Sequence, residues 1–220
     1  EALLAIEIEK RIPVGGGLGG GSADAGAVLR GLNALNPSPL PGAALLALAG
    51  SLGADVPFLT QADSPLALAW GRGDRLLGLP ALPARACFLF CPDAGVSTAD
   101  AFRWIDQSTT AHPATQYQLR ALGQWAGIEQ AAGNDFEAVV TARHPVIGQL
   151  LDTLRAPGAR ELLGERALVQ MSGSGSTVFA LRGDAGGDPA GAWNWRSDEP
   201  GVQALLTSTS VRVEPVILTD

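Results

Sequence analysis

The 220-residue sequence is poor in the side chains that usually bind zinc or act as catalytic bases. It has two cysteines and two histidines, and its single lysine, Lys10, leaves 14 arginines among the 15 basic residues. His112 and His144 each precede a proline in loop-like sequence, with no cysteine or second histidine nearby. We therefore set aside a zinc hydrolase and a Ser-His-Asp enzyme and expect both histidines at the surface.

The two cysteines are too few and too badly spaced for a disulfide framework. Cys87 and Cys91 lie four residues apart in a stretch that predicts a buried strand, where such a separation is too long for a disulfide. We expect both to be small buried hydrophobic side chains in a reducing compartment, and hence a cytoplasmic protein.

Positive charge, aromatic residues and long apolar runs are also scarce. The net charge is −7, no basic run occurs, and six Phe, five Trp and one Tyr are spread along the chain. We therefore expect no nucleic-acid partner and no membrane surface, and runs such as residues 43–49 are too short to span a bilayer. The sequence opens with Glu-Ala-Leu-Leu, without methionine or a signal-like segment, so we expect an upstream part to be missing.

Glycine, by contrast, is concentrated in one short stretch. Six of the seven residues 15–21 are glycine, and each costs roughly 0.5–1 kcal/mol relative to alanine inside a regular element. Residues 5–12 alternate as in a strand, and residues 22–35 are typical of a helix with Ser22 as its N-cap. Because strand, loop and helix follow without a break, a flexible linker is disfavoured and an anion site is predicted, with phosphate as its natural ligand.

The rest of the chain alternates between helical and extended patterns. The predicted helices are 43–52, 98–107, 115–126, 135–142 and 145–154. The predicted strands are 66–70, 74–79, 87–91, a pair around a second glycine turn within 168–181, and a final strand at 211–218. Residues 183–201, with Trp193 and Trp195, are expected to form a surface loop. This order predicts an α+β protein with two domains, residues 1–84 and 85–220, divided near the proline-rich segment 79–83.

Two common glycine-rich phosphate-binding motifs do not fit this sequence. Residues 15–20 satisfy G-x-G-x-x-G, but a proline-rich segment, 36–41, stands where a dinucleotide fold needs an acidic residue after a second strand. A Walker loop needs Gly-Lys-Ser/Thr, and no lysine lies among these glycines.

A third pattern, Pro-x-x-x-Gly-Leu-Gly followed by small residues and serine, fits residues 13–22 throughout. Here the sequence resembles the superfamily of galactokinase, homoserine kinase, mevalonate kinase and phosphomevalonate kinase. The triple glycine before Ser22, residues 10–13, Gly-Ala-Asp-Val-Pro-Phe at 53–58, Asn-Asp-Phe-Glu at 134–137 and Met-Ser-Gly-Ser-Gly at 171–175 are similar to the 4-diphosphocytidyl-2-C-methyl-D-erythritol kinases within it. The resemblance covers nearly the whole chain.

The resemblance implies a small-molecule kinase fold, with a partial ribosomal-protein-S5-like domain followed by a ferredoxin-like domain. It implies ATP and Mg²⁺ as cofactors and phosphorylation of the 2-hydroxyl of a cytidine-diphosphate-linked methylerythritol, in the non-mevalonate isoprenoid pathway. The implied ATP-binding residues are Lys10, Pro13, Gly15, Gly16, Gly17, Leu18, Gly19, Gly20, Gly21, Ser22 and Ala23. The implied second glycine turn, which closes over the site, comprises Ser172, Gly173, Ser174 and Gly175.

Four residues have more than one interpretation. Asp55 matches the catalytic aspartate of the family, whereas the residues alone are equally typical of a turn-stabilising aspartate. The Ser22 hydroxyl can contact a phosphate or Mg²⁺, or simply cap the helix. Either Lys10 or Arg11 can face phosphate, since alternation places them on opposite faces.

The sequence also departs from the family. Ala23 stands where a second serine is usual, and the tryptophan-containing loop replaces a helix. The family's N-terminal part, with a lysine that works with the catalytic aspartate and residues that grip the acceptor, is expected to be absent. Another kinase of the superfamily and a catalytically silent nucleotide-binding protein therefore remain alternatives, and the oligomeric state is open.

Overall fold

A computed structural model describes residues 4–108, 118–183 and 201–218. The chain divides into two compact units. Unit 1 comprises the residues up to Val14, Gly19–Gly78 and the residues from Val213 on, whereas unit 2 comprises Gly15–Leu18 and Leu79–Arg212. The tip of the glycine loop thus belongs to unit 2, although the residues on either side of it belong to unit 1. The domain boundary expected after residue 84 stays a prediction.

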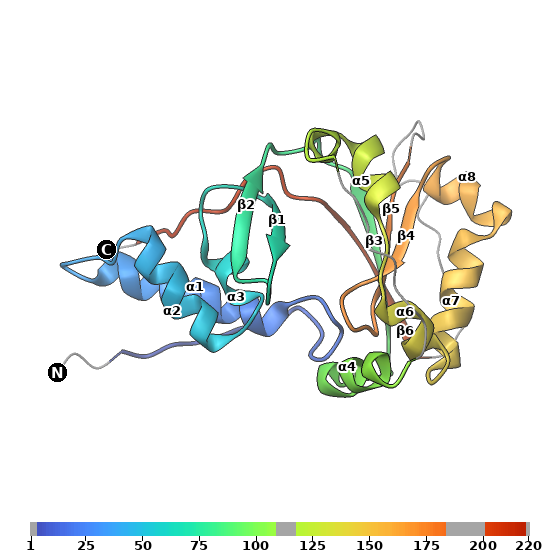
Figure 1. The fold of residues 1–220 in the computed structure, drawn as a ribbon, viewed down its shortest axis with the longest axis horizontal. Helices are drawn as coiled ribbons and strands as arrows, with labels where there is room; N and C mark the ends of the chain where they lie inside the picture. Colours follow the sequence, from blue (N-terminus) through green and yellow to red (C-terminus); the bar gives the residue numbers. More distant parts are fainter. Residues whose placement is uncertain (1–3, 109–117, 184–200, 219–220) are drawn as a thin grey trace. The chain divides into compact units, whose positions relative to one another are not determined.

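Unit 1 consists of three helices and a two-stranded sheet (Figure 1). Its elements are α1 (Gly20–Leu35), α2 (Gly42–Leu52), α3 (Val56–Thr60), β1 (Leu66–Trp70) and β2 (Arg75–Leu79). Gly26 brings α1 and α3 together, because a Cβ built on it would lie 2.6 Å from the carbonyl oxygen of Leu59. Only a residue without a side chain allows two helix backbones to approach so closely.

Two predictions in this unit are wrong. Residues 5–12 alternate like a strand but form none, because no other described segment pairs with them and a strand needs a hydrogen-bonded neighbour. Ser22 does not cap α1. The helix begins two residues earlier, because Gly19 adopts a left-handed conformation (φ 68°) as the N-cap.

Unit 2 is built on a four-stranded antiparallel sheet in the order β4-β5-β3-β6 (Figure 1). Its strands are β3 (Ala86–Pro92), β4 (Leu168–Met171), β5 (Val178–Leu181) and β6 (Val202–Ser208). Its helices are α4 (Thr98–Asp106), η1 (Ala121–Gly123), α5 (Trp125–Ala131), α6 (Phe136–Thr141), α7 (Pro145–Arg155), η2 (Pro157–Ala159) and α8 (Arg160–Leu163). Numbered along the chain, the strand order 2-3-1-4 is that of a ferredoxin-like sheet.

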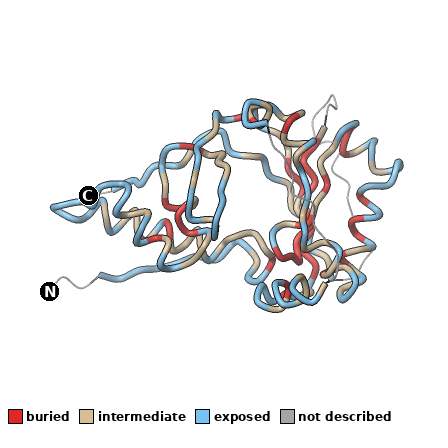
Figure 2. The backbone as a smooth tube through the Cα atoms, viewed as in Figure 1, coloured by how far each residue is buried: buried red, intermediate tan, exposed pale blue. Residues whose placement is uncertain are grey.

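One face of this sheet forms the main core. Phe88 lies opposite Ala180 on β5 and Leu206 on β6, and Phe90 lies opposite Val178 and Ala204 in the same way. These side chains pack against Leu151 and the other buried residues of α7. Figure 2 shows the buried residues gathered along these strands and the helices beside them.

Two elements of unit 2 differ from prediction. No strand forms at 211–218, where Pro215 lacks an N–H for a ladder; β6 instead occupies 202–208 and pairs with the whole of β3. The described part of the helix expected at 115–126 forms the short turn η1, and α5 follows it. Trp193, Trp195, His112 and most of the loop expected at 183–201 lie outside the described residues.

The remaining predicted elements are confirmed to within a few residues at each end, and both cysteines are free and buried. Among the described residues, no helix is both long and apolar enough to cross a membrane.

Candidate nucleotide-phosphate site

The start of α1 presents unpaired backbone donors. The first helical hydrogen bond runs from the Ala23 N–H to the Gly19 carbonyl (2.9 Å). The N–H groups of Gly20, Gly21 and Ser22 have no partner among the described residues, and neither does the Ser22 hydroxyl. Since α1 begins with glycines and has no acidic residue in its first turn, an anion can approach these donors closely.

Lys10 lies beside this helix start. Its ammonium group forms an ion pair with the Asp24 carboxylate, and a Cβ built on Gly20 would lie 3.7 Å from Lys10 Nζ. Arg11 instead pairs with Glu9 at 2.9 Å, and both side chains are largely exposed. Of the two basic residues, Lys10 is therefore the one whose ammonium group lies near the start of α1, where the Asp24 carboxylate balances its charge.

The tip of the glycine loop interlocks with the second glycine turn inside unit 2. Ser172 Oγ donates to the Gly17 carbonyl (2.8 Å), and the Thr177 N–H donates to the Gly16 carbonyl (3.1 Å). A Cβ on Gly17, where φ is 73°, would lie 2.3 Å from the Ser172 carbonyl oxygen and 2.6 Å from that of Gly175. Gly17 therefore has both a steric and a conformational reason to be glycine.

The second turn closes the hairpin between β4 and β5. The Ser172 N–H donates to the Thr177 carbonyl (2.8 Å), and the Gly175 N–H donates back to the Ser172 carbonyl (2.9 Å). The Ser174 hydroxyl lies 2.9 Å from that of Thr98, so α4 supports the turn from one side.

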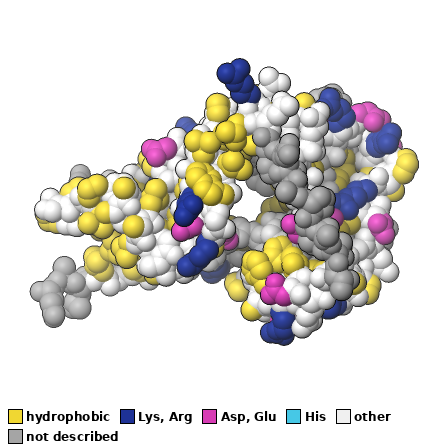
Figure 3. All heavy atoms as spheres, viewed as in Figure 1, with side chains coloured by type: hydrophobic (Ala, Val, Ile, Leu, Met, Phe, Trp, Pro, Cys, Tyr) yellow, Lys and Arg dark blue, Asp and Glu magenta, His cyan; other side chains and the backbone are white. Residues whose placement is uncertain are grey.

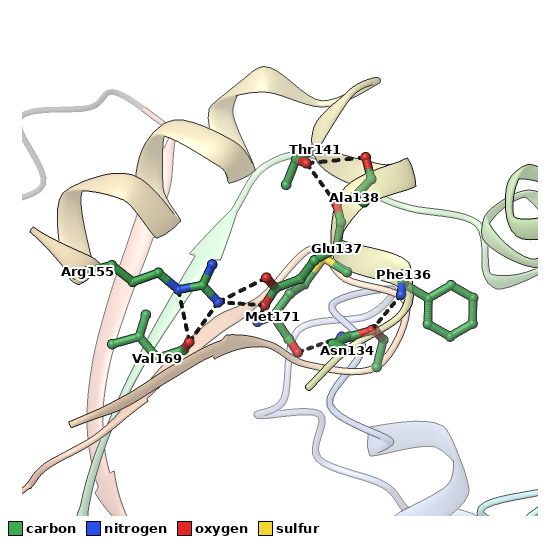
Figure 4. Close-up of polar contacts among 9 residues, drawn as sticks. Asn134, Phe136, Glu137, Ala138, Thr141, Arg155, Val169 and Met171 are labelled. Carbon is green, nitrogen blue, oxygen red and sulfur yellow. Dashed lines mark hydrogen bonds and ion pairs between the residues drawn. The ribbon is translucent and has the colours of Figure 1, made fainter. Parts of the chain in front are cut away.

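Two residues whose roles sequence reasoning missed brace the same turn (Figure 4). Asn134 Nδ2 donates to the carbonyls of Met171 and Gly173, both at 2.8 Å, and Glu137 Oε1 accepts from the Met171 N–H at 2.9 Å. The Asn-Asp-Phe-Glu motif contained the signal, but only the structure places it against the turn.

Asp55 is the N-cap of α3 in unit 1 and is exposed. Its carboxylate makes no hydrogen bond or ion pair with any described residue, whereas its carbonyl accepts from the Leu59 N–H (3.3 Å). The turn between β1 and β2 supports its neighbour, since a Cβ on Gly73 would lie 3.1 Å from the Ala54 carbonyl oxygen. Contacts within unit 1 thus fix the backbone around Asp55, and its carboxylate is accessible to a ligand.

The site holds few protein ligands for a cation. No group of three or more His, Cys, Asp or Glu side chains suited to a metal occurs among residues 4–108, 118–183 and 201–218. Mg²⁺ usually keeps several waters and takes few protein oxygens when phosphates also bind it, so one serine hydroxyl such as that of Ser22 fits it.

Comparison with known proteins gives this geometry a context. Residues 2–62 match the family model described as the N terminal domain of GHMP kinases. Proteins named 4-diphosphocytidyl-2-C-methyl-D-erythritol kinase are 39% identical over 180 residues in Enterococcus faecalis and 41% identical over 184 residues in Citrifermentans bemidjiense. These alignments cover 81% and 82% of this chain, and 60% and 61% of the relatives.

A solved structure gives the same result. The crystal structure of a 4-(cytidine 5'-diphospho)-2C-methyl-D-erythritol kinase matches with a TM-score of 0.59 and 36% identity, covering 79% of this chain and 59% of that one. The α+β class and the likeness to the GHMP kinase fold are therefore confirmed. Within that class, the chain is similar to the 4-diphosphocytidyl-2-C-methyl-D-erythritol kinases, as its motifs predicted. It spans about three fifths of the length of the curated relatives that it matches.

The predicted site residues fall into two groups. Unit 2 brings Gly16 and Gly17 together with the turn Ser172–Gly175, and unit 1 brings Lys10 to the start of α1. Pro13 and Leu18 are half-buried at either side of the tip, Gly15 is exposed with a φ of 78°, and Ala23 makes the first hydrogen bond of α1.

Proposed function

We propose that the protein transfers the γ-phosphoryl group of ATP to the 2-hydroxyl of 4-diphosphocytidyl-2-C-methyl-D-erythritol. The observation that carries this proposal is the interlocked pair of glycine turns, in a chain similar to kinases named for that acceptor. We further propose a cytoplasmic location, which the two free, buried cysteines favour.

The residues of the loop bind and neutralise phosphate. The unpaired N–H groups of residues 20–22 donate to phosphate oxygens at the positive end of α1, and the ammonium group of Lys10, ion-paired with Asp24, lies nearby. When bound, Mg·ATP supplies the phosphoryl group and part of the charge neutralisation. The Ser22 hydroxyl is the protein oxygen that we assign to Mg²⁺. Phosphoryl transfer requires mainly such positioning and charge stabilisation from the protein.

Asp55 acts on the acceptor. Its exposed carboxylate accepts a hydrogen bond from the substrate hydroxyl, orients the oxygen lone pair and takes the proton as the new P–O bond forms. General base catalysis of this kind contributes roughly 10²–10⁴-fold to a rate. No described residue competes for this carboxylate, which leaves its lone pairs free for the substrate.

The test is ADP release by the protein with ATP, Mg²⁺ and three acceptors in parallel: 4-diphosphocytidyl-2-C-methyl-D-erythritol, mevalonate and homoserine. We expect turnover with the cytidylylated acceptor alone and a loss of about 10²–10⁴-fold in Asp55→Asn. Asp63→Asn, a change of the same kind at an exposed loop residue of unit 1, should leave the rate unchanged. Turnover with another acceptor would reassign the substrate, and ATP binding without turnover on any of them would indicate a silent nucleotide-binding protein.

A further inference from the structure

On the unpaired side of the edge strand β4, side chains make the hydrogen bonds that a neighbouring strand would otherwise make. In the order β4-β5-β3-β6, only one side of β4 is paired with another described strand. Along its other side, the Met171 N–H donates to Glu137 Oε1 (2.9 Å), and Arg155 donates to the Val169 carbonyl (2.8 Å). Glu137 and Arg155 also form an ion pair at 2.9 Å. Together they satisfy two backbone groups on the unpaired edge of the strand, as Figure 4 shows.

Asn134 continues this brace past the end of the strand. Its amide donates to the Met171 and Gly173 carbonyls at once, so it fixes the backbone where β4 becomes the glycine turn. Its own orientation is set by the Phe136 N–H, which donates to Oδ1 at 2.8 Å. The Asn134 side chain therefore accepts a hydrogen bond through Oδ1 and donates two to the turn through Nδ2.

The turn to which Asn134 donates, Ser172–Gly175, is also the turn that is hydrogen-bonded to the glycine loop. Ser172 Oγ, one residue after Met171, donates to the Gly17 carbonyl, and Thr177 N–H donates to the Gly16 carbonyl. Two glycines in the turn have positive φ, 53° at Gly173 and 87° at Gly175, so this backbone has many alternative conformations when released. Fixing it removes that freedom before a ligand arrives.

We propose that Asn134 and Glu137 are positioning residues that set the shape of the glycine-loop tip for binding the phosphates of ATP. The inference rests on the proposed function for its ligand, but the geometry that it describes exists without one. Neither side chain is assigned a contact with ATP; both act through the Ser172–Gly175 turn.

The decisive variant is Asn134→Asp, which keeps the size of the side chain. It replaces two donors by a carboxylate oxygen facing two carbonyls. We expect ATP binding to weaken about 10- to 100-fold, the factor by which the apparent affinity falls when only about 10% to 1% of molecules keep the binding-competent tip. Asn33→Asp is the matched control: Asn33 also bridges a loop, accepting from the Leu40 N–H at 2.7 Å, but it lies in unit 1, near the C-terminal end of α1.

Two measurements are made on the whole protein. Calorimetric titration with Mg·ATP gives both the dissociation constant and the fraction of competent protein; a merely structural role would lower the fraction and leave the constant unchanged. Hydrogen exchange of a peptide covering residues 14–19, without nucleotide, reports the tip directly, and we expect roughly tenfold faster exchange in Asn134→Asp. Ser172→Ala, which removes only the bond to Gly17, should change both readouts in the same direction and serves if Asn134→Asp fails to fold.

The outcomes separate the two proposals. A wild-type protein that binds no ATP would refute the proposed function, and exchange at the tip would still decide whether the brace exists. If Asn134→Asp and Asn33→Asp match the wild-type protein in dissociation constant and in exchange, the positioning role is wrong.

Discussion

Ser172 Oγ donates a 2.8 Å hydrogen bond to the carbonyl oxygen of Gly17, a residue 155 positions earlier in the chain. This bond joins two glycine turns. Each turn contains glycines with positive φ angles, which other residues rarely adopt, and hydrogen bonds between the two turns fix the conformation of both. The paired turns fix the tip of the glycine loop, and the residues that follow the tip, 20–22, present the candidate phosphate donors.

Gly17→Ala should separate the two turns. The added Cβ would meet the backbone oxygens of Ser172 and Gly175 at 2.3 and 2.6 Å, and φ is positive, so we expect a stability loss of about 1–3 kcal/mol. Gly21→Ala is the control, because nothing lies within 4 Å of its Cβ. It should leave stability unchanged or raise it by about 0.5–1 kcal/mol in urea unfolding. Equal stability of the two variants would contradict the interlocked geometry.

Gly26→Ala should loosen the packing that holds Asp55. Its Cβ would lie 2.6 Å from the Leu59 carbonyl oxygen and 3.1 Å from the Thr60 nitrogen, both backbone atoms of α3. We expect the free energy of unfolding to fall by about 1–3 kcal/mol. Gly31→Ala on the same helix meets nothing within 4 Å and should be stabilising by up to about 1 kcal/mol. Thermal unfolding of both variants checks the difference, and a stable Gly26→Ala protein would show that the helices lie further apart.

Glu129 should make part of the stability dependent on pH. Burial alone would raise the pKa of Glu129, but hydrogen bonds and charges from Arg85 and Arg166 outweigh it and hold the pKa below its ordinary value. A carboxyl group whose pKa is lowered by folding stabilises the protein above its unfolded pKa, about 4.3. That contribution is lost as the pH falls through the lower, folded pKa.

Glu129→Gln tests this directly by urea unfolding at neutral pH and between pH 5 and 3. We expect a loss of about 1–3 kcal/mol at neutral pH and a shallower decline on acidification than in the wild-type protein. Glu165→Gln, at a carboxylate that is 68% exposed and 3.4 Å from Arg160, should change stability by less than about 1 kcal/mol. Parallel pH profiles for Glu129→Gln and the wild-type protein would rule out this coupling.

The two cysteines should be unreactive in the folded protein. Burial raises the pKa of Cys87 to about 11, so only about one thiol in a thousand is ionised at pH 8. Cys91 is 5% exposed, and its sulfur accepts from Thr177 Oγ1 at 3.6 Å. We expect no reaction with a chromogenic disulfide reagent at pH 8 until guanidinium is added, when two thiols appear. Fast reaction of the native protein would mean that β3 opens readily.

Short-range patterns carried much of the fold. The periodicity of α7, the helix-forming residues of α2 and the turn residues around β1 and β2 were enough to predict these elements, because each is specified by its own residues. The strand predicted at residues 5–12 was wrong because an alternating pattern forms a strand only where a partner strand exists. The strand expected at 211–218 failed for a related reason: β6 is fixed by its register with β3, which local sequence does not encode.

The site divides in the same way. The glycine loop and Asp55 were predicted as site residues because their motifs are contiguous in sequence, and their roles stay predictions. The roles of Asn134 and Glu137 could not be predicted, because their contacts to Met171 and Gly173 span 34 to 39 residues. Unit 1 also exposes many hydrophobic side chains over α1 and α2 (Figure 3). Leu35 and Leu52 are each 58% exposed. Composition alone could not locate them.

The central claim is phosphoryl transfer to a specific acceptor, and product analysis tests it most directly. The protein is incubated with Mg·ATP and 4-diphosphocytidyl-2-C-methyl-D-erythritol, and the acceptor is examined by mass spectrometry and ³¹P NMR, beside the Asp55→Asn variant. The account predicts one added phosphate on the 2-hydroxyl, formed by the wild-type protein and nearly absent with the variant. An acceptor recovered unchanged while ADP accumulates, or equal product from both proteins, would contradict it.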